Sequence, residues 1–200
     1  MKAMTLRLLG TLSLAVACGP TLTGCIPLVA AGAVGTGVLI ADDRRTSGTY
    51  VDDEGIELKT GSRIGERHRD GTHVNVTSYN KVVLLTGEVA SEDARLEIGR
   101  IAKGVEGVRH VVNELAVGPV SSLSSRSSDT YITSHVKARF IDARRFQVNH
   151  VKVVTENRVV YLMGLVSQNE AEAAAAIAAR TGDVRKVVQV FEFTGTAKKP

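Results

Sequence analysis

Cys25 is the residue whose type and surroundings most clearly predict covalent chemistry. It ends the run Leu22-Thr23-Gly24-Cys25, a lipobox pattern in which small residues admit the chain to the lipoprotein signal peptidase and the cysteine sulfur carries the lipid. Lys2 and Arg7 form a positive region ahead of the apolar stretch Leu8–Val16, the order typical of a signal peptide. The sequence therefore predicts a signal peptide over residues 1–24 and lipidation of Cys25.

Two other interpretations of this amino terminus stay open. One is an ordinary secretory signal with a small-residue cleavage site. The other is an uncleaved transmembrane anchor that continues to Ile40, although repeated Gly and Pro lower the helix propensity of the stretch. Several acyl chains would anchor the protein to a membrane stably, whereas a single acyl chain gives only marginal membrane binding.

The residue after the lipidated cysteine is Ile26 rather than Asp. By the sorting convention of enterobacteria-like cells, this predicts the periplasmic face of the outer membrane. Residues 25–45 are rich in small residues and are predicted to form a lipidated tether. Cleavage would remove Cys18, so neither cysteine can form a disulfide in a folded core.

The histidines are the other residues whose type could support chemistry. No two of them are spaced as an i, i+4 pair, and the mature chain would have no free cysteine to serve as a ligand. We therefore expect no metal-binding site. We also find no nucleophile elbow, phosphate loop or dinucleotide pattern, so we expect a non-enzyme without a cofactor. The five histidines are His68, His73, His110, His135 and His150.

Composition favours small folded modules and gives little support for nucleic-acid binding. Hydrophobic residues make up 44% of the 200 residues, and the formal charge of +4 is spread along the chain with acidic residues interleaved. Residues 46–118 hold nine basic and twelve acidic side chains, whereas residues 129–195 hold nine basic and seven acidic ones. The second half is therefore better suited to an anionic surface.

The chain contains an internal repeat. At an offset of 77 positions, residues 80–89 align with 157–166, and after a one-residue gap 108–112 align with 184–188. A duplication is the simplest explanation. We therefore predict two domains, at 46–118 and 129–195, joined by a Ser-rich linker at 119–128 and followed by a tail at 196–200.

Each copy is predicted to begin with an amphipathic helix whose apolar positions are spaced by four. A second helix is predicted at about 91–103 in the first copy and 168–180 in the second. Asp129 is a good candidate N-cap for the first helix of the second copy. The spaced positions are Ile56, Thr60 and Ile64 in the first copy and Ile132, Val136 and Phe140 in the second.

Short β-rich runs separate the helices and are predicted to form a hairpin and a final strand. The order helix, strand, strand, helix, strand predicts an α+β fold with two helices on one face of a three-stranded mixed sheet and a partly exposed opposite face. The two copies either pack on each other or are staggered around the linker. The predicted strands are 74–78, 82–88 and 108–117, then 151–155, 159–166 and 184–193, with hairpin turns at 79–80 and 156–157.

The repeated glycines, Gly87 and Gly164, are expected to let the chain leave the hairpin and enter the helix. The runs around them, at 82–89 and 159–166, resemble the BON domain family, and with the lipobox the whole chain resembles dual-BON outer-membrane lipoproteins. The resemblance implies binding of anionic phospholipid by the second domain and a role in outer-membrane integrity under envelope stress and in division. Related sequences often carry Trp where this chain has Tyr131.

A helical wheel of the first helix of the second copy separates two stripes. One stripe carries Ile132, Val136, Phe140 and Ala143 and is predicted to face the core. The other stripe combines an aromatic ring with cations, which suits a lipid headgroup layer. An ordinary solvated helix face is the alternative. The predicted lipid-contact residues are Tyr131, Ser134, His135, Ala138, Arg139 and Arg145.

In the first copy, the corresponding face offers Glu57, Lys59 and Arg63 without an aromatic residue. We expect that face to support structure or protein contacts. The competing hypothesis for the whole chain is a protein adaptor, in which exposed sheet faces or edges bind outer-membrane assembly proteins and lipid contact is incidental.

Overall fold

The computed structural model describes residues 43–195. The predicted signal peptide, the lipidated Cys25, residue Ile26, most of the tether and the tail lie outside the described residues. Within the described range, none of the helices combines the length and the apolar character needed to span a bilayer.

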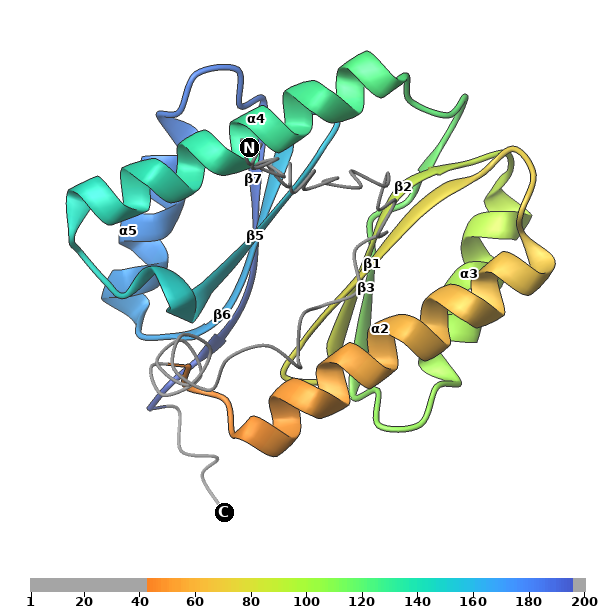
Figure 1. Cartoon of the computed structure of the whole chain (residues 1–200), viewed down its shortest axis with the longest axis horizontal. Coiled ribbons are helices and arrows are strands. Elements are labelled where there is room, and N and C mark those ends of the chain that lie inside the picture. The colour runs from red at the N-terminus through yellow and green to blue at the C-terminus, as the bar shows by residue number, and fades with distance from the viewer. Residues whose placement is uncertain (1–42, 196–200) are drawn as a thin grey trace, which may run out of the picture. The chain divides into compact units, whose positions relative to one another are not determined.

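The first module, residues 47–117, contains two helices and a sheet in the predicted order (Figure 1). The predicted last strand is interrupted at Glu114 and Leu115, so that it forms two short strands. The elements are α2 (Ser47–Arg67), β1 (His73–Tyr79), β2 (Val82–Val89), α3 (Glu92–Lys103), β3 (His110–Asn113) and β4 (Ala116–Val117).

The second module, residues 123–193, repeats this order with a 3-10 turn before its first strand. Its second helix carries a capping box, in which Ser167 and Glu170 each accept a backbone N–H of the other. The elements are α4 (Leu123–Ala143), η1 (Val148–His150), β5 (Val151–Glu156), β6 (Val159–Val166), α5 (Gln168–Ala179) and β7 (Lys186–Phe193).

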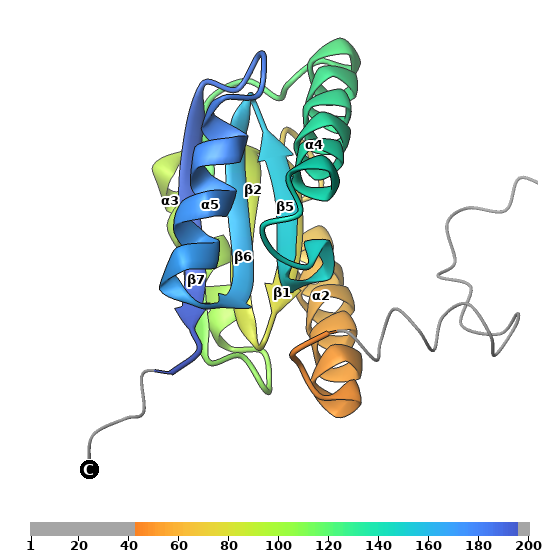
Figure 2. The same ribbon diagram turned by 90° about the vertical axis from the view of Figure 1, so that its left-hand side faces the viewer.

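Each module has a mixed sheet whose central strand is the second strand of the hairpin. Strand β2 pairs antiparallel with β1 and parallel with β3 and β4. Strand β6 pairs antiparallel with β5 and parallel with β7. In each module both helices lie on the same side of the sheet (Figures 1 and 2). The predicted α+β arrangement is therefore confirmed.

The spacing of four apolar residues correctly identifies the buried side of both first helices. Ile56, Thr60 and Ile64 are buried in α2, and Ile132, Val136 and Phe140 are buried in α4. Ala143, predicted on the same stripe, is exposed. It is the last residue of α4, where the chain turns away from the sheet.

The prediction that Asp129 is the N-cap of α4 is wrong. The helix begins seven residues earlier than predicted, at Leu123, and Ser122 is its N-cap, with an Oγ that accepts the Ser125 N–H at 3.1 Å. Most of the Ser-rich segment is therefore helical. The Asp129 carboxylate is instead buried, and it accepts the backbone N–H groups of Asn157 at 2.9 Å and Arg158 at 2.8 Å.

Both hairpin turns lie one residue later than predicted. They consist of Asn80-Lys81 and Asn157-Arg158, and all four residues have positive φ, between 47° and 65°. Two consecutive residues with positive φ define the two-residue hairpin turn that matches the twist of the strands. Asp53 binds the first turn as Asp129 binds the second, through N–H groups at 2.8 and 2.7 Å.

The role predicted for the two repeated glycines is also wrong. Gly87 lies inside β2 and Gly164 inside β6, not at the turn into the helix. A Cβ on Gly87 would lie 1.9 Å from the carbonyl oxygen of His73, and one on Gly164 would lie 2.3 Å from that of His150. Close approach of two backbones therefore requires glycine at both positions.

The sheet faces opposite the helices pack on each other, which is one of the two arrangements predicted, and they are more buried than the predicted partly exposed face. Successive residues of β2 point to opposite sides, so Val83 and Leu85 face the helices while Val82 and Leu84 face away. The away-facing residues are buried against the other module. This shared cluster comprises Tyr79, Val82, Leu84, Tyr161 and Met163.

Candidate functional site

Helix α4 presents the candidate site, because packing fixes which of its sides reaches solvent. Ile132, Val136 and Phe140 are buried among α5 and the sheet of the second module. The side of the helix opposite these residues is therefore exposed. Five of the six predicted lipid-contact residues are exposed on it: Tyr131, Ser134, His135, Ala138 and Arg139.

Tyr131 and His135 form the most distinctive feature of this surface. Tyr131 is 58% exposed, and its ring centroid lies 4.1 Å from that of His135, one helical turn later, with an angle of 36° between the ring planes. Such a pair presents an apolar body with polar edges. Ser134, beside it, donates its hydroxyl to the Thr130 carbonyl at 3.0 Å.

Ile141 extends the apolar part of the surface and was missed from the sequence. It follows Ala138 by three residues, so it continues the same side of the helix, and it is 61% exposed. Leu123, at the start of α4, is exposed as well. The spacing from Tyr131 through Ala138 to Ile141 was the signal that could have revealed it.

The two predicted arginines differ in position. Arg139 donates from Nη1 to the carbonyl oxygen of Arg180 at 2.9 Å, so it also fastens the end of α5. Arg145 lies beyond the end of α4, because Arg144 ends the helix in a left-handed conformation with φ of 50°. The helical-wheel placement of Arg145 is therefore wrong.

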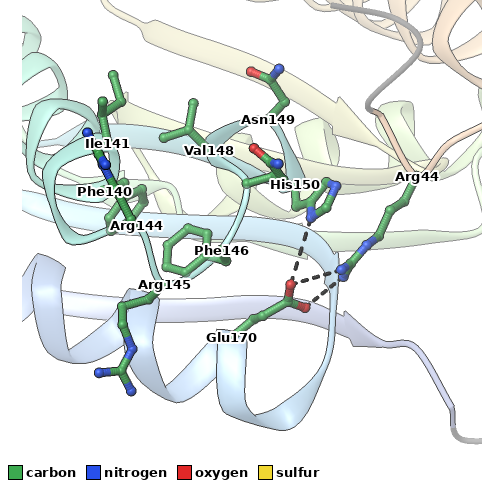
Figure 3. A pocket seen from close by; sticks show the side chains of 11 residues that line it. Arg44, Phe140, Ile141, Arg144, Arg145, Phe146, Val148, Asn149, His150 and Glu170 are labelled. Atoms are coloured by element: carbon green, nitrogen blue, oxygen red, sulfur yellow. Dashed lines mark hydrogen bonds and ion pairs between the residues drawn. The ribbon is translucent and has the colours of Figure 1, made fainter.

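Arg145 instead lines a hollow of about 620 Å³ at the carboxyl end of α4 (Figure 3). Ile141 and Phe146 contribute apolar surface, and Arg144 contributes a second cation. Within the described residues, neither Arg144 nor Arg145 makes a side-chain hydrogen bond or ion pair. Their positive charge is thus available to an anion from outside.

The acidic residue of this hollow is already neutralised. Arg44 binds both carboxylate oxygens of Glu170, at 2.7 and 2.8 Å, and also donates to the Leu165 carbonyl at 2.8 Å (Figure 3). The hydrogen bonds from Arg44 lower the pKa of Glu170 to about 2. Glu170 therefore adds little repulsion toward an anion at Arg145.

The equivalent face of the first module is occupied differently. Glu57 accepts a hydrogen bond from Lys152 Nζ at 2.8 Å and one from the Ser78 N–H at 2.7 Å. Arg63 donates to the Gly104 carbonyl at 3.1 Å. These contacts give Glu57 and Arg63 structural roles. A structural role is one of the two roles expected for this face from the sequence.

The BON domain model matches residues 52–119 and 128–195. The chain belongs to the BON domain family, with two copies of the domain.

Three proteins are similar to this chain over most of its length. The chain is 38% identical to outer membrane lipoprotein DolP of Haemophilus influenzae, over 95% of this chain and 99% of that protein. It is 33% identical to a 21 kDa hemolysin of Actinobacillus pleuropneumoniae, over 76% and 79% of the two chains. It is 34% identical to osmotically-inducible protein Y of Escherichia coli, over 70% of this chain and 72% of that protein.

Proposed function

We propose that this protein is an outer-membrane lipoprotein facing the periplasm, which binds anionic phospholipid through α4 and thereby supports envelope integrity under stress and during division. Similarity to DolP over nearly the whole of both chains supports the location. The predicted lipidation of Cys25 would supply the anchor, so α4 adds a second, selective contact rather than the attachment itself.

The observation that carries this proposal is the combination of exposed apolar and cationic groups along one helix. Tyr131 and Ile141 would enter the boundary between headgroups and acyl chains, where an amphipathic ring is favoured. Arg145 would meet the phosphate with charge-assisted hydrogen bonds. Each cation near an anionic surface contributes about 1 kcal/mol, so the contact is weak and sensitive to salt.

Vesicle sedimentation tests the contribution of α4 once the acyl anchor is absent. A soluble form that begins at Asp43 should sediment with vesicles of phosphatidylcholine and phosphatidylglycerol, less with phosphatidylcholine alone, and less again as salt rises. The double variant Tyr131→Ala, Arg145→Ala should lose most of the binding, because it removes the ring and an unpaired cation together.

A matched double variant in the first module provides the control. Leu58 is exposed on α2, and Arg69 follows the end of α2 by two residues, as Arg145 follows the end of α4. The variant Leu58→Ala, Arg69→Ala should bind as the parent does. Binding that ignores lipid charge, or that survives loss of Tyr131 and Arg145, would contradict the proposal.

Protein binding through the first module is the second candidate function. Val51 and Leu58 lie seven residues apart on α2, hence on one side, and are 68% and 74% exposed. They lie on the more acidic module, which suits a protein partner such as outer-membrane assembly machinery better than an anionic lipid. Photo-crosslinking from position 58 in cells should then yield a discrete adduct, and none should form from exposed Lys103.

A further inference from the structure

His73, Glu88 and Glu156 bring three potential metal ligands together where the two modules meet. His73 and Glu88 are paired residues of β1 and β2 in the first module, and Glu156 ends β5 in the second. His73 Nδ1 lies 3.3 Å from Glu88 Oε2 and 3.8 Å from Glu156 Oε1. One ligand atom from each of the three residues lies within 4.8 Å of the other two.

The cluster holds more buried negative charge than its surroundings balance. Glu88 and Glu156 are each only 6% exposed. Among the described residues, neither forms an ion pair with a lysine or arginine, so His73 is the one potential cation in contact with both. Burial, and to a smaller extent the charge of Glu88, raises the pKa of Glu156. Burying two carboxylates with one imidazole is costly unless a further positive charge is present.

We propose that His73, Glu88 and Glu156 bind a divalent transition-metal ion of the zinc class. Zinc bonds to imidazole nitrogen and carboxylate oxygen at about 2.0–2.2 Å, which places tetrahedral ligands about 3.3 Å apart. The His73–Glu88 separation already meets this value, and the remaining separations need a modest contraction. One imidazole with two carboxylates leaves the fourth position to water.

Neighbouring groups already orient the two carboxylates. Asn75 Nδ2 donates to Glu156 Oε2 at 2.7 Å, which leaves Oε1, the oxygen nearer His73, for the ion. The Ser121 N–H donates to Glu88 Oε2 at 3.1 Å. Second-shell contacts of this kind fix the direction of ligand lone pairs at metal sites. The Ser121 hydroxyl oxygen is itself buried and lacks a hydrogen-bond partner among the described residues.

A hollow of about 540 Å³ gives the cluster access to solvent. His73 and Glu156 line it, together with Asn75 and Thr133, so an ion and its water ligand could enter there. Arg126 also lines the hollow, but it forms no ion pair with either glutamate. Exposed residues of α4, including Ser134 and Lys137, also line this hollow. None of the three proposed ligands belongs to α4, and the inference does not depend on lipid binding.

The consequence of metal binding is a link between the modules. Two ligands belong to the first module and one to the second, so the bound ion would oppose their separation. A ligand that binds only the folded form raises the apparent stability. We therefore expect zinc to raise the melting temperature of the whole chain.

Metal titration of the full chain in detergent, after dialysis against a chelator, tests this inference. Calorimetry with Zn²⁺ should give one ion per chain, and Co²⁺ should give the visible absorption of a low-symmetry site. The variants His73→Ala and Glu156→Gln should each weaken binding at least tenfold and abolish the rise in melting temperature. Glu156→Gln preserves size and the oxygen that accepts from Asn75, so it keeps the test valid if His73→Ala fails to fold.

The variant His110→Ala removes an exposed histidine from the same module and serves as the control. It should bind zinc as the parent does. The inference is overturned if the parent shows no saturable binding, or if His73→Ala and Glu156→Gln bind zinc as tightly as His110→Ala.

Discussion

At the residue scale, two successive arginines connect the end of the tether to both modules. Arg44 binds Glu170 of the second module. Arg45 forms an ion pair with Asp53 of the first module at 2.8 Å, and its guanidinium lies 4.1 Å from the centre of the Tyr79 ring. Arg44 and Arg45, which lie shortly before α2, are therefore part of the folded structure.

The Arg44–Glu170 pair should make stability depend on pH in the acid range. The Glu170 pKa is lowered from 4.5 to about 2 by its hydrogen bonds to Arg44, so the pair stabilises the fold fully above pH 4.5 and loses this effect as the pH falls toward 2. Glu170→Gln retains the capping oxygen but removes the charge. Thermal unfolding should show the variant less stable than the parent at pH 7, with a difference that shrinks between pH 4.5 and 2. A difference that stays constant with pH would contradict this assignment.

At the element scale, each module depends on a close approach between the two strands of its hairpin. Gly164 of β6 faces the carbonyl group of His150, the residue immediately before β5, with no room for a methyl group. The same contact recurs at Gly87 in the first module. The repeat therefore preserves a backbone contact as well as a pattern of apolar side chains.

Gly164→Ala should destabilise the second module by about 1–3 kcal/mol or more, because backbone rather than a flexible side chain must move. Chemical denaturation provides the measurement. Gly61→Ala is the control: Gly61 lies in α2 with nothing within 4 Å of an added Cβ, so alanine should stabilise the helix by about 0.5–1 kcal/mol. Equal effects at the two positions would rule out the close-approach explanation.

At the scale of the whole molecule, the sheet faces of the two modules form a common apolar cluster. Met163 is fully buried in it, and burial raises the pKa of Tyr161 to about 12. Polar contacts surround the cluster, including Lys152 with Glu57 at 2.8 Å and a hydrogen bond between Asn80 and Glu192. We therefore expect the modules to unfold together.

Met163→Lys tests this coupling, because it places an unpaired charge in the shared cluster, which a buried site tolerates poorly. Calorimetry should show one transition for the parent and two, at lower temperature, for the variant. Met163→Leu, which conserves volume, should cost less than about 1.5 kcal/mol and keep one transition. A single unchanged transition in Met163→Lys would show that the modules do not depend on this contact.

The sequence by itself determined the elements and the duplication. Residues such as Ile132, Val136 and Phe140 are spaced so that one side of a helix is apolar, and this periodicity depends only on local backbone geometry. The hairpins and both second helices follow from equally local signals. The exposed position of Tyr131 follows from the same spacing, since it lies off the buried stripe.

Only the tertiary structure decided what each surface meets. Periodicity shows that Leu84 and Met163 alternate with core residues, but it does not show that the two modules cover them. In the sequence, Asp129 resembles a helix N-cap. The N–H groups that it binds belong to the Asn157-Arg158 turn, which lies far along the chain, so no local pattern reveals them. His73 and Glu156 come together for the same reason: contacts between strands of different modules are set by packing, which no local spacing encodes.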